Sequence, residues 1–445
     1  MTDYRSVADA VAEDIRAGRL GVGDRLPTQR EFARRYGIAN STATRVYQEL
    51  ARRGLTTGHV GRGTFVRTAA DTPAPALSEP VDSRVDLTLN HPVVPEQAGL
   101  LAAGLERLVR PDALEPVLRP VGPDGTATAR DAAADLLARG GWRPDPARVL
   151  FAGSGRQAIS AVVAALTRPG ARVGVEELTY PVLKAIAARL GVTLVPLAMD
   201  EAGLIPEAVE EAHRAGPLHA VYVQPTLHNP LSLTMPDGRL DQLADVLLRR
   251  SIPAVEDAVW AFLRDDRPPL AARAPERTIL VDSLSKRLAP GLSLGFAVAP
   301  AALANDVAAS LRSGGWVPMR FPLEAMSRWQ ADGTVRKLVG AKQRQAAARQ
   351  ELAELHLGDF VTRTAPVSYY RWWELPRPWR ADTFVAAAAR HGIAVTPAAA
   401  FSTGRHRAPH AIRLGLATPS TETLTRALTT LTDLARSTPD DLAED

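Results

Sequence analysis

The chain lacks cysteine altogether. This absence excludes disulfide bonds, thiolate catalysis, cysteine zinc sites and iron–sulfur clusters, and it fits a reducing compartment. Long hydrophobic runs are missing too. A membrane helix needs about 18 consecutive apolar residues, and no apolar stretch of the sequence is that long. The first residues carry acids where a signal peptide carries bases. We therefore predict a cytoplasmic protein with no membrane partner and no metal site.

Lysine is almost absent as well. Of the 53 basic side chains only four are lysines, namely Lys184, Lys286, Lys337 and Lys342. A guanidinium keeps its proton at every ordinary pH, whereas a primary amine can lose it and then react. Each lysine is therefore a candidate for amine chemistry. The alternative is a plain surface charge, which we favour for Lys184, Lys337 and Lys342.

Basic charge is concentrated at the N-terminal end. Residues 1–67 hold 12 basic and 7 acidic side chains, whereas the rest of the chain is close to neutral. A stretch rich in proline, alanine and serine follows, which is the composition of an extended linker. The 445 residues thus divide into a basic domain at 1–67, a linker at 68–85 and a large domain at 86–440.

The basic domain has the pattern of three short helices and a hairpin. Ser6 is placed to cap a first helix, and Thr28 with Glu31 makes a capping-box pattern at the start of a second. A third helix from about Ser41 has an apolar face made of Ala43, Val46, Tyr47 and Leu50. The glycine-rich run TTGHVGRGTFVR predicts a β-hairpin. This arrangement fits a major groove of DNA, although a protein-interaction module of three helices has the same spacing.

The head resembles the winged helix-turn-helix of the GntR family of bacterial regulators over residues 4–67, in the stretch GRLGVGDRLPTQREFARRYGIANSTATRVYQELARRGLTTGHVGRGTFV. The resemblance implies a double-stranded DNA operator as partner. The DNA contacts that it implies come from Arg30, Asn40, Ser41, Thr42, Arg45 and Arg62. The family commonly has Ser-Arg before the third helix, where this chain has Ala39 and Asn40.

The large domain alternates β-rich runs with helical stretches. The runs are RVLFA, ARVGVE, VTLVPLA, HAVYVQP, IPAVED, RTILVDS and LGFAVAP, and helices are expected at 155–167, 181–190 and 236–250. Such alternation predicts an α/β domain with a mostly parallel sheet. After about residue 357 the order changes to strand, helix, strand and helix, which predicts a small C-terminal α+β subdomain.

Three elements of the large domain point to one ligand. Lys286 follows the run RTILVDS between serines, which suits an amine that forms a Schiff base with a carbonyl cofactor. Asp257 ends the run IPAVED, where a carboxylate can pair with a protonated pyridine nitrogen. The run FAGSGRQAI places small residues at a helix start that favours a phosphate. Taken singly, a surface amine, a helix cap and an ordinary turn remain alternatives.

Residues 86–436 resemble the fold-type I aminotransferases that use pyridoxal 5'-phosphate (PLP), and with the GntR-like head the chain resembles the MocR/GabR subfamily of regulators. The resemblance implies that Lys286 carries the internal aldimine, that Asp257 pairs with the pyridine nitrogen, and that Asn229 faces the ring hydroxyl. It further implies stacking by Tyr180 and a carboxylate clamp at Arg413. The implied phosphate ligands are Gly155, Arg156, Ser283 and Ser285.

The chain departs from the aminotransferase pattern at several positions. Trp260 replaces a tyrosine that helps to hold the cofactor ring, Ser293 replaces a phosphate-binding arginine, and Pro120 stands where a tyrosine reaches the partner subunit's phosphate. The asparagine is followed by Pro230, Leu231 and Ser232 instead of Pro-Thr-Gly. The loss of two charge-assisted phosphate contacts is expected to weaken cofactor binding by about 10² to 10⁴.

Three functions follow from these features. We favour a PLP-dependent DNA-binding transcriptional regulator that senses an amino compound, or PLP itself. The alternatives are an active PLP-dependent aminotransferase that carries a DNA-binding domain, and a regulator whose body has lost the cofactor. All three predict a homodimer, and the resemblance implies a head-to-tail arrangement in which each head lies against the body of the other chain.

Overall fold

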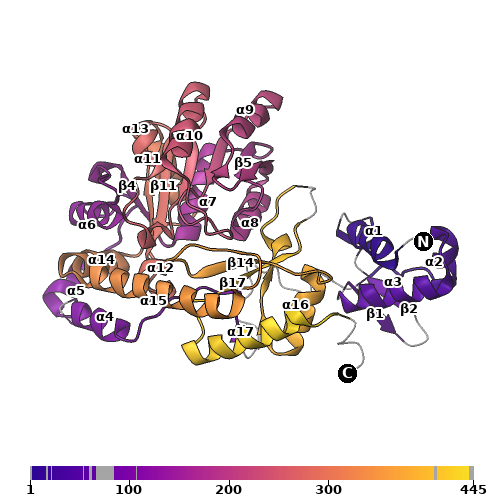
Figure 1. Cartoon of the computed structure of the whole chain (residues 1–445). Coiled ribbons are helices and arrows are strands. Elements are labelled where there is room, and N and C mark those ends of the chain that lie inside the picture. Colours follow the sequence, from indigo (N-terminus) through magenta and orange to yellow (C-terminus); the bar gives the residue numbers. More distant parts are fainter. Residues whose placement is uncertain are drawn as a thin grey trace.

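The computed structural model describes residues 3–16, 19–21, 23–53, 55–59, 63–66, 85–106, 108–404 and 408–439. Figure 1 shows a small head at one end, in indigo, and a larger body that carries the remaining elements. Within these ranges none of the helices combines the length and the hydropathy that a bilayer span needs. The predicted linker lies almost entirely outside the described residues.

The head contains the predicted three helices and hairpin. They are α1 (Tyr4–Arg16), α2 (Gln29–Tyr36), α3 (Asn40–Arg52), β1 (Thr56–His59) and β2 (Gly63–Val66), with β1 and β2 antiparallel. The capping box is confirmed, because Glu31 N donates to Thr28 Oγ1 at 3.3 Å and Thr28 N donates to Glu31 Oε2 at 3.0 Å. Gly37 ends α2 with a φ of 62°, which glycine adopts without strain.

One prediction about the head is wrong. Ser6 does not cap α1, because the helix already begins at Tyr4. Asp3 takes the capping role: its carboxylate accepts from Arg5 N at 3.1 Å, and the Ser6 hydroxyl donates to Asp3 O at 2.7 Å. The predicted apolar face of α3 is confirmed, since all four of its residues are buried.

The seven predicted strand runs form one seven-stranded sheet in the body. The strands are β4 (Val149–Ala152), β5 (Arg172–Glu176), β6 (Thr193–Leu197), β9 (Ala220–Val223), β10 (Ala254–Asp257), β11 (Thr278–Ser283) and β12 (Gly295–Val298). Their order is β4-β12-β11-β10-β9-β5-β6, and only β12 runs antiparallel to its neighbours. The predicted α/β domain with a mostly parallel sheet is therefore confirmed.

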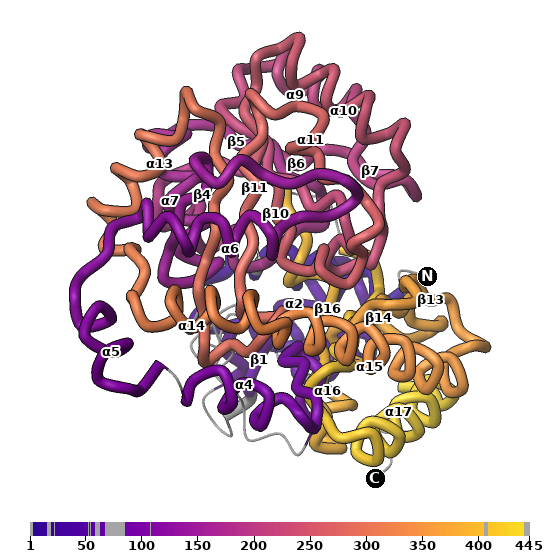
Figure 2. Tube along the Cα trace, turned by 90° about the vertical axis from the view of Figure 1, so that its left-hand side faces the viewer, coloured from indigo at the N-terminus to yellow at the C-terminus, as the bar shows by residue number. Residues whose placement is uncertain are grey.

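Helices cover both faces of this sheet (Figures 1 and 2). Figure 2 shows α14 and α15 beneath the sheet, where they run along the boundary with the C-terminal part. The helices of the large domain, including those beneath the sheet, are α4 (Gln97–Leu105), α5 (Pro111–Val117), α6 (Ala127–Leu137), α7 (Gly155–Leu166), α8 (Pro181–Leu190), α9 (Pro206–Ala215), α10 (Asp237–Arg250), α11 (Leu270–Arg273), α12 (Leu284–Arg287), α13 (Ala301–Ser313), α14 (Arg320–Ala331) and α15 (Thr334–Leu357).

The C-terminal part is built on a second sheet with antiparallel pairs. Its strands follow the order β13 (Thr362–Arg363), β14 (Tyr370–Glu374), β17 (Ala411–Gly415) and β16 (Thr396–Pro397). Helices α16 (Ala381–Arg390) and α17 (Thr421–Arg436) pack on it and share one apolar core. The strand β3 (Val85–Asp86) pairs with β15 (Ile393–Ala394), so the chain enters the body at this small subdomain.

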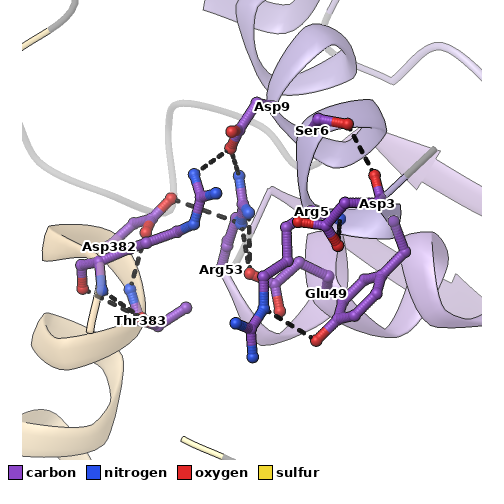
Figure 3. A network of polar contacts seen from close by, with 10 residues as sticks. Asp3, Arg5, Ser6, Asp9, Glu49, Arg53, Asp382 and Thr383 are labelled. Atoms are coloured by element: carbon purple, nitrogen blue, oxygen red, sulfur yellow. Dashed lines mark hydrogen bonds and ion pairs between the residues drawn. The ribbon is translucent and has the colours of Figure 1, made fainter. Parts of the chain in front are cut away.

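The head contacts the small subdomain of its own chain through a cluster of charges (Figure 3). Within the head, Arg53 Nη1 lies 2.8 Å from Asp9 Oδ1, and Arg53 Nε donates to Glu49 Oε1 at 2.8 Å. Two ion pairs cross to the start of α16: Arg53 with Asp382 at 3.7 Å, and Arg380 with Asp9. We call these five residues the ionic joint.

Candidate functional site

A cavity of about 450 Å³ opens where the large domain meets the small subdomain. It lies at the carboxyl ends of several parallel strands, the edge of an α/β sheet where ligands bind. All ten residues that the sequence assigned to the cofactor and effector line it. They are Gly155, Arg156, Tyr180, Asn229, Asp257, Trp260, Ser283, Ser285, Lys286 and Arg413.

Lys286 lies on the one-turn helix α12 directly after β11. Its Nζ donates to Asn90 O at 2.7 Å and lies 5.6 Å from the centre of the Trp260 ring. Burial lowers the pKa of Lys286 to about 7, with help from the charges of Arg413 and Arg156. The surface-amine alternative for Lys286 is thus wrong, and much of the amine is neutral near pH 7.

Asp257 is buried at the end of β10. One carboxylate oxygen accepts from the Tyr222 hydroxyl, and the other accepts from Val259 N at 3.1 Å. Burial raises the pKa of Asp257 to about 6, although these two hydrogen bonds act in the opposite direction. A cationic ligand group next to this carboxylate would offset the free-energy cost of burying its negative charge.

The opposite end of the cavity suits an anion. Gly155 is the first residue of α7, whose N-cap Ser154 accepts from Gln157 N, and helix N-terminal amides attract anions. A side chain at position 155 would place its Cβ 2.9 Å from Ser283 Cβ, so glycine keeps this cradle open. The hydroxyls of Ser283 and Ser285 lie 2.7 Å apart beside it, and the exposed Arg156 completes the rim.

Arg413 enters from the small subdomain on β17. Its Nη1 donates to Asn229 Oδ1 at 3.2 Å, and its guanidinium lies 5.2 Å from the Phe401 ring centre. Burial lowers the pKa of Arg413 to about 10. No salt bridge joins it to a carboxylate within the described residues, and its buried Nε has no hydrogen-bond partner there. Such a site favours an incoming carboxylate.

Sequence reasoning missed several residues that line the cavity or support its lining. Tyr222 on β9 is the hydrogen-bond donor to Asp257, and its place in the strand run HAVYVQP was the signal available for it. No local pattern pointed to Thr88, Asn90, Thr396 and Phe401, which reach the cavity from segments distant along the chain.

Two of the lysines that we favoured as surface charges are not exposed. Lys337 is exposed as expected. Lys184 is half-buried and its Nζ donates to Ala400 O and Ser402 O at 3.1 and 2.9 Å, because α8 packs against that loop. Lys342 is 0% exposed, because α15 turns it toward α12.

The structure also shows where the positions that depart from the aminotransferase pattern lie. Trp260 is buried beside Phe262, Tyr369 and Tyr370. Ser293 lines the cavity with a hydroxyl where the family pattern has a guanidinium. Pro120 is exposed in the loop after α5. Arg156 is therefore the arginine that this chain offers at the anion end.

Five of the six predicted DNA contacts lie on helices α2 and α3 of the head. Arg30 on α2 and Asn40, Ser41 and Arg45 on α3 are exposed, and Thr42 is half-exposed. Arg45 also lies over the Tyr4 ring at 5.9 Å. Arg62 in the predicted wing lies outside the described residues. The exposed start of α3 thus has the small polar and basic groups that major-groove binding needs.

Two family models match the chain. "Aminotransferase class I and II" matches residues 85–431, and "Bacterial regulatory proteins, gntR family" matches residues 3–66. A similar protein is the uncharacterized HTH-type transcriptional regulator YdeF of Bacillus subtilis, which is 29% identical over 94% of this chain and 91% of that protein. The HTH-type pyridoxine biosynthesis transcriptional regulator PdxR of Corynebacterium glutamicum is 27% identical over 82% of each chain.

The body is also similar to solved structures. The crystal structure of the Pyrococcus horikoshii kynurenine aminotransferase aligns with a TM-score of 0.73 at 20% identity, over 83% of this chain and 95% of that one. These matches confirm the predicted fold class and the resemblance to the MocR/GabR subfamily. They also confirm PLP as the predicted cofactor at the level of the family.

Proposed function

The chain belongs to the aminotransferase class I and II family, and its head matches the gntR family of bacterial regulators. On this basis we propose that the protein controls transcription in response to PLP or an amino compound. The observation that carries the proposal is the convergence in one cavity of an amine, a buried carboxylate, an anion cradle and an arginine that no carboxylate of the described residues pairs with. A body with these groups, fixed to a DNA-reading head, suits a sensor.

The groups of the cavity match the chemistry of PLP from one end to the other. When bound, PLP supplies an aldehyde that reacts with amines and a ring that withdraws electrons. We assign Lys286 as the reacting amine, Asp257 as the partner of the ring nitrogen and Asn229 as the partner of the ring hydroxyl. Tyr180 and Trp260 flank the ring, and Arg413 holds an effector carboxylate. The phosphate is assigned to Gly155, Arg156, Ser283 and Ser285.

We place regulation ahead of turnover because of the anion end. Catalysis needs the cofactor to stay in place while its covalent bond to the protein is exchanged, and the phosphate contacts hold it during that exchange. Here Ser293 and Pro120 offer no cation, and Arg156 is exposed at the rim. Such a site suits reversible binding and release of PLP or an amino compound better than repeated turnover.

The route from cavity to head is proposed to be the segment 396–404. Thr396 and Phe401 line the cofactor cavity, whereas Pro397, Ser402 and Gly404 line a second cavity of about 820 Å³ between the head and the small subdomain. The same segment follows α16, whose N-cap Arg380 and first-turn Asp382 belong to the ionic joint. A ligand that binds Arg413 and shifts it would therefore act on the segment 396–404, which lines both cavities.

The assembly is proposed to be a homodimer that reads two half-sites of one operator, as a single winged head reads only one. The predicted head-to-tail arrangement would set each head against the body of the other chain, whereas in this structure the head contacts the small subdomain of its own chain. That arrangement and the domain boundaries 1–67, 68–85 and 86–440 remain predictions. A DNA partner places the protein with the chromosome, so cytoplasmic residence is part of the same proposal.

A salt titration of DNA binding tests the regulatory function. The full-length protein selects duplexes from a random-sequence pool, and its affinity for the selected duplex is then measured with and without PLP. We expect a selected sequence, a log–log salt slope of about −0.9 for each phosphate neutralised, and an affinity that differs between the two states. A slope near zero would rule out DNA as the partner.

Arginine variants of the head sharpen this test. Replacing Arg30 and Arg45 by Gln is expected to weaken binding about tenfold or more and to reduce the salt slope by about one unit per lost phosphate contact. The matched control is Arg189→Gln, which removes an exposed arginine from the body. If that control weakens binding as much, the groove contact of the head is disproved.

Binding of PLP is expected to strengthen with pH through about 6. Below that pH the carboxyl of Asp257 holds a proton, because its pKa is raised to about 6, and it then offers no charge to a pyridinium. Above it the carboxylate is ionised, its burial cost is offset by the cationic ring, and affinity levels off. The measurement is the dissociation constant of PLP between about pH 5 and 8, made in Lys286→Ala so that covalent attachment does not contribute.

The control for this profile is Lys286→Ala combined with Asp257→Asn. The amide has no proton to lose in this range, so any slope that remains reports the phosphate of PLP, whose second pKa is about 6. Equal slopes in the two proteins would remove Asp257 from the cofactor site.

A further inference from the structure

Lys342 is a buried amine directly behind Lys286. It lies on α15 with 0% exposure, and its Nζ donates to Lys286 O at 3.0 Å and also to Leu288 O. Within the described residues no carboxylate forms a salt bridge with it. Burial, together with the smaller effect of the charge of Lys286, lowers the pKa of Lys342 to about 7.

The two carbonyl oxygens that accept from Lys342 lack the N–H donors that a continuing helix would give them. The helical partner of Lys286 O would be the N–H of residue 290, which is a proline and has none. The N–H of Leu292, four residues after Leu288, donates to Ala289 O instead. Helix α12 is one turn long, so its end is not satisfied by further turns.

Donor counting indicates the state in which Lys342 fits. A neutral amine has two N–H donors, and two carbonyl oxygens accept from this Nζ among the described residues, whereas an ammonium has three donors. An arginine at this position would keep its charge at any pH. The need for an amine that can be neutral explains why lysine persists here in a chain that otherwise uses arginine.

We propose that Lys342 is a positioning residue for Lys286: it anchors the main chain of α12 from the side opposite the cavity, and it does so as an uncharged donor that leaves the Lys286 amine neutral and reactive. Lys342 does not line the cavity, so a cofactor or effector bound there would not touch it. The inference rests on the proposed role of Lys286 as the amine that binds PLP.

The test compares Lys342→Met, Lys342→Gln and, as a matched control, Lys337→Met on the exposed side of the same helix. The reactivity of Lys286 in the PLP-free full-length protein is followed by reductive methylation with formaldehyde and borohydride, with peptide mass spectrometry, from about pH 6 to 9. The rate of covalent capture of PLP is measured in parallel by visible absorbance. Methylation does not involve PLP, so a wild type that fails to capture PLP disproves the proposed function without deciding this inference.

The Met variant is expected to slow both reactions of Lys286 about ten- to hundredfold, because two buried carbonyls lose their donor and α12 shifts. The Gln variant keeps two N–H donors and is expected to react at a rate close to wild type at high pH. Its pH midpoint should move upward, because no positive charge can form behind Lys286 at low pH. Lys337→Met should match wild type throughout.

Rates and midpoints in both Lys342 variants equal to those of Lys337→Met would overturn the proposal. Far-ultraviolet circular dichroism shows whether the Met variant folds. Where it does not, the Gln midpoint alone decides, because a residue that only fills space would leave that midpoint unchanged.

Discussion

Replacing Lys286 by Ala is expected to abolish covalent capture of PLP. The wild type should gain a visible absorbance band with PLP and, after borohydride reduction, a mass adduct on the peptide that contains Lys286. The variant should show neither. The expected effect is complete because Lys286 is the only lysine among the residues that line the cavity.

The positions of the other amines explain why none should substitute. Lys184 is held by two carbonyls of the loop before β17, Lys342 lies behind α12, and Lys337 is exposed on α15. The lowered pKa of Lys286 adds to this selectivity, because a neutral amine attacks an aldehyde and an ammonium does not.

The matched control is Lys337→Ala, which also removes one amine and should leave the adduct intact. An adduct of equal yield in Lys286→Ala would show that PLP reacts elsewhere and would disprove the site. A wild type that remains colourless would favour the alternative in which the body has lost its cofactor and only joins two heads.

The convergence of the site could be predicted from sequence because sheet geometry requires it. Asp257 and Ser283 end neighbouring parallel strands, β10 and β11, and Lys286 follows the second within three residues. The carboxyl ends of such strands share one edge, so residues far apart in the chain meet there. Strand runs flanked by turn residues were enough to place them.

Other features had no local pattern to reveal them. Asn90 O accepts from Lys286 across 196 positions of sequence, and Arg380 reaches Asp9 across 371. The burial of Lys342 depends on how α15 packs against α12, which its own neighbours in sequence do not encode. Ser6 was misplaced because aspartate and serine are both good caps, and the helix begins at the earlier one.

The ionic joint gives the second large prediction. Arg53→Met is expected to lower the free energy of unfolding of the head by about 3–5 kcal/mol. The Arg53 side chain is 1% exposed and holds the carboxylates of Asp9 and Glu49 at 2.8 Å each. Methionine fills similar space but leaves the buried carboxylate of Glu49 and the partly buried carboxylate of Asp9 without this guanidinium. The measurement is hydrogen exchange of α1 and α3 against urea, which reports the head separately from the body.

An exposed ion pair serves as the control for this prediction. Arg436→Gln removes a partner of Asp359 at 3.5 Å, where the arginine side chain is 57% exposed, so a change below about 1 kcal/mol is expected. If Arg53→Met destabilises the head no more than this, the buried pairs are not what holds α1 against α3.

Arg380→Gln separates the stability of the head from its communication with the body. This change leaves the pairs of Arg53 within the head intact and removes only the guanidinium that crosses from α16 to Asp9. The head should therefore keep nearly all its stability and bind the selected duplex, while the difference in affinity between the PLP-loaded and PLP-free protein becomes smaller. By linkage the same variant should weaken the effect of DNA on PLP affinity by an equal factor. An undiminished response would mean that the signal travels by a route other than α16.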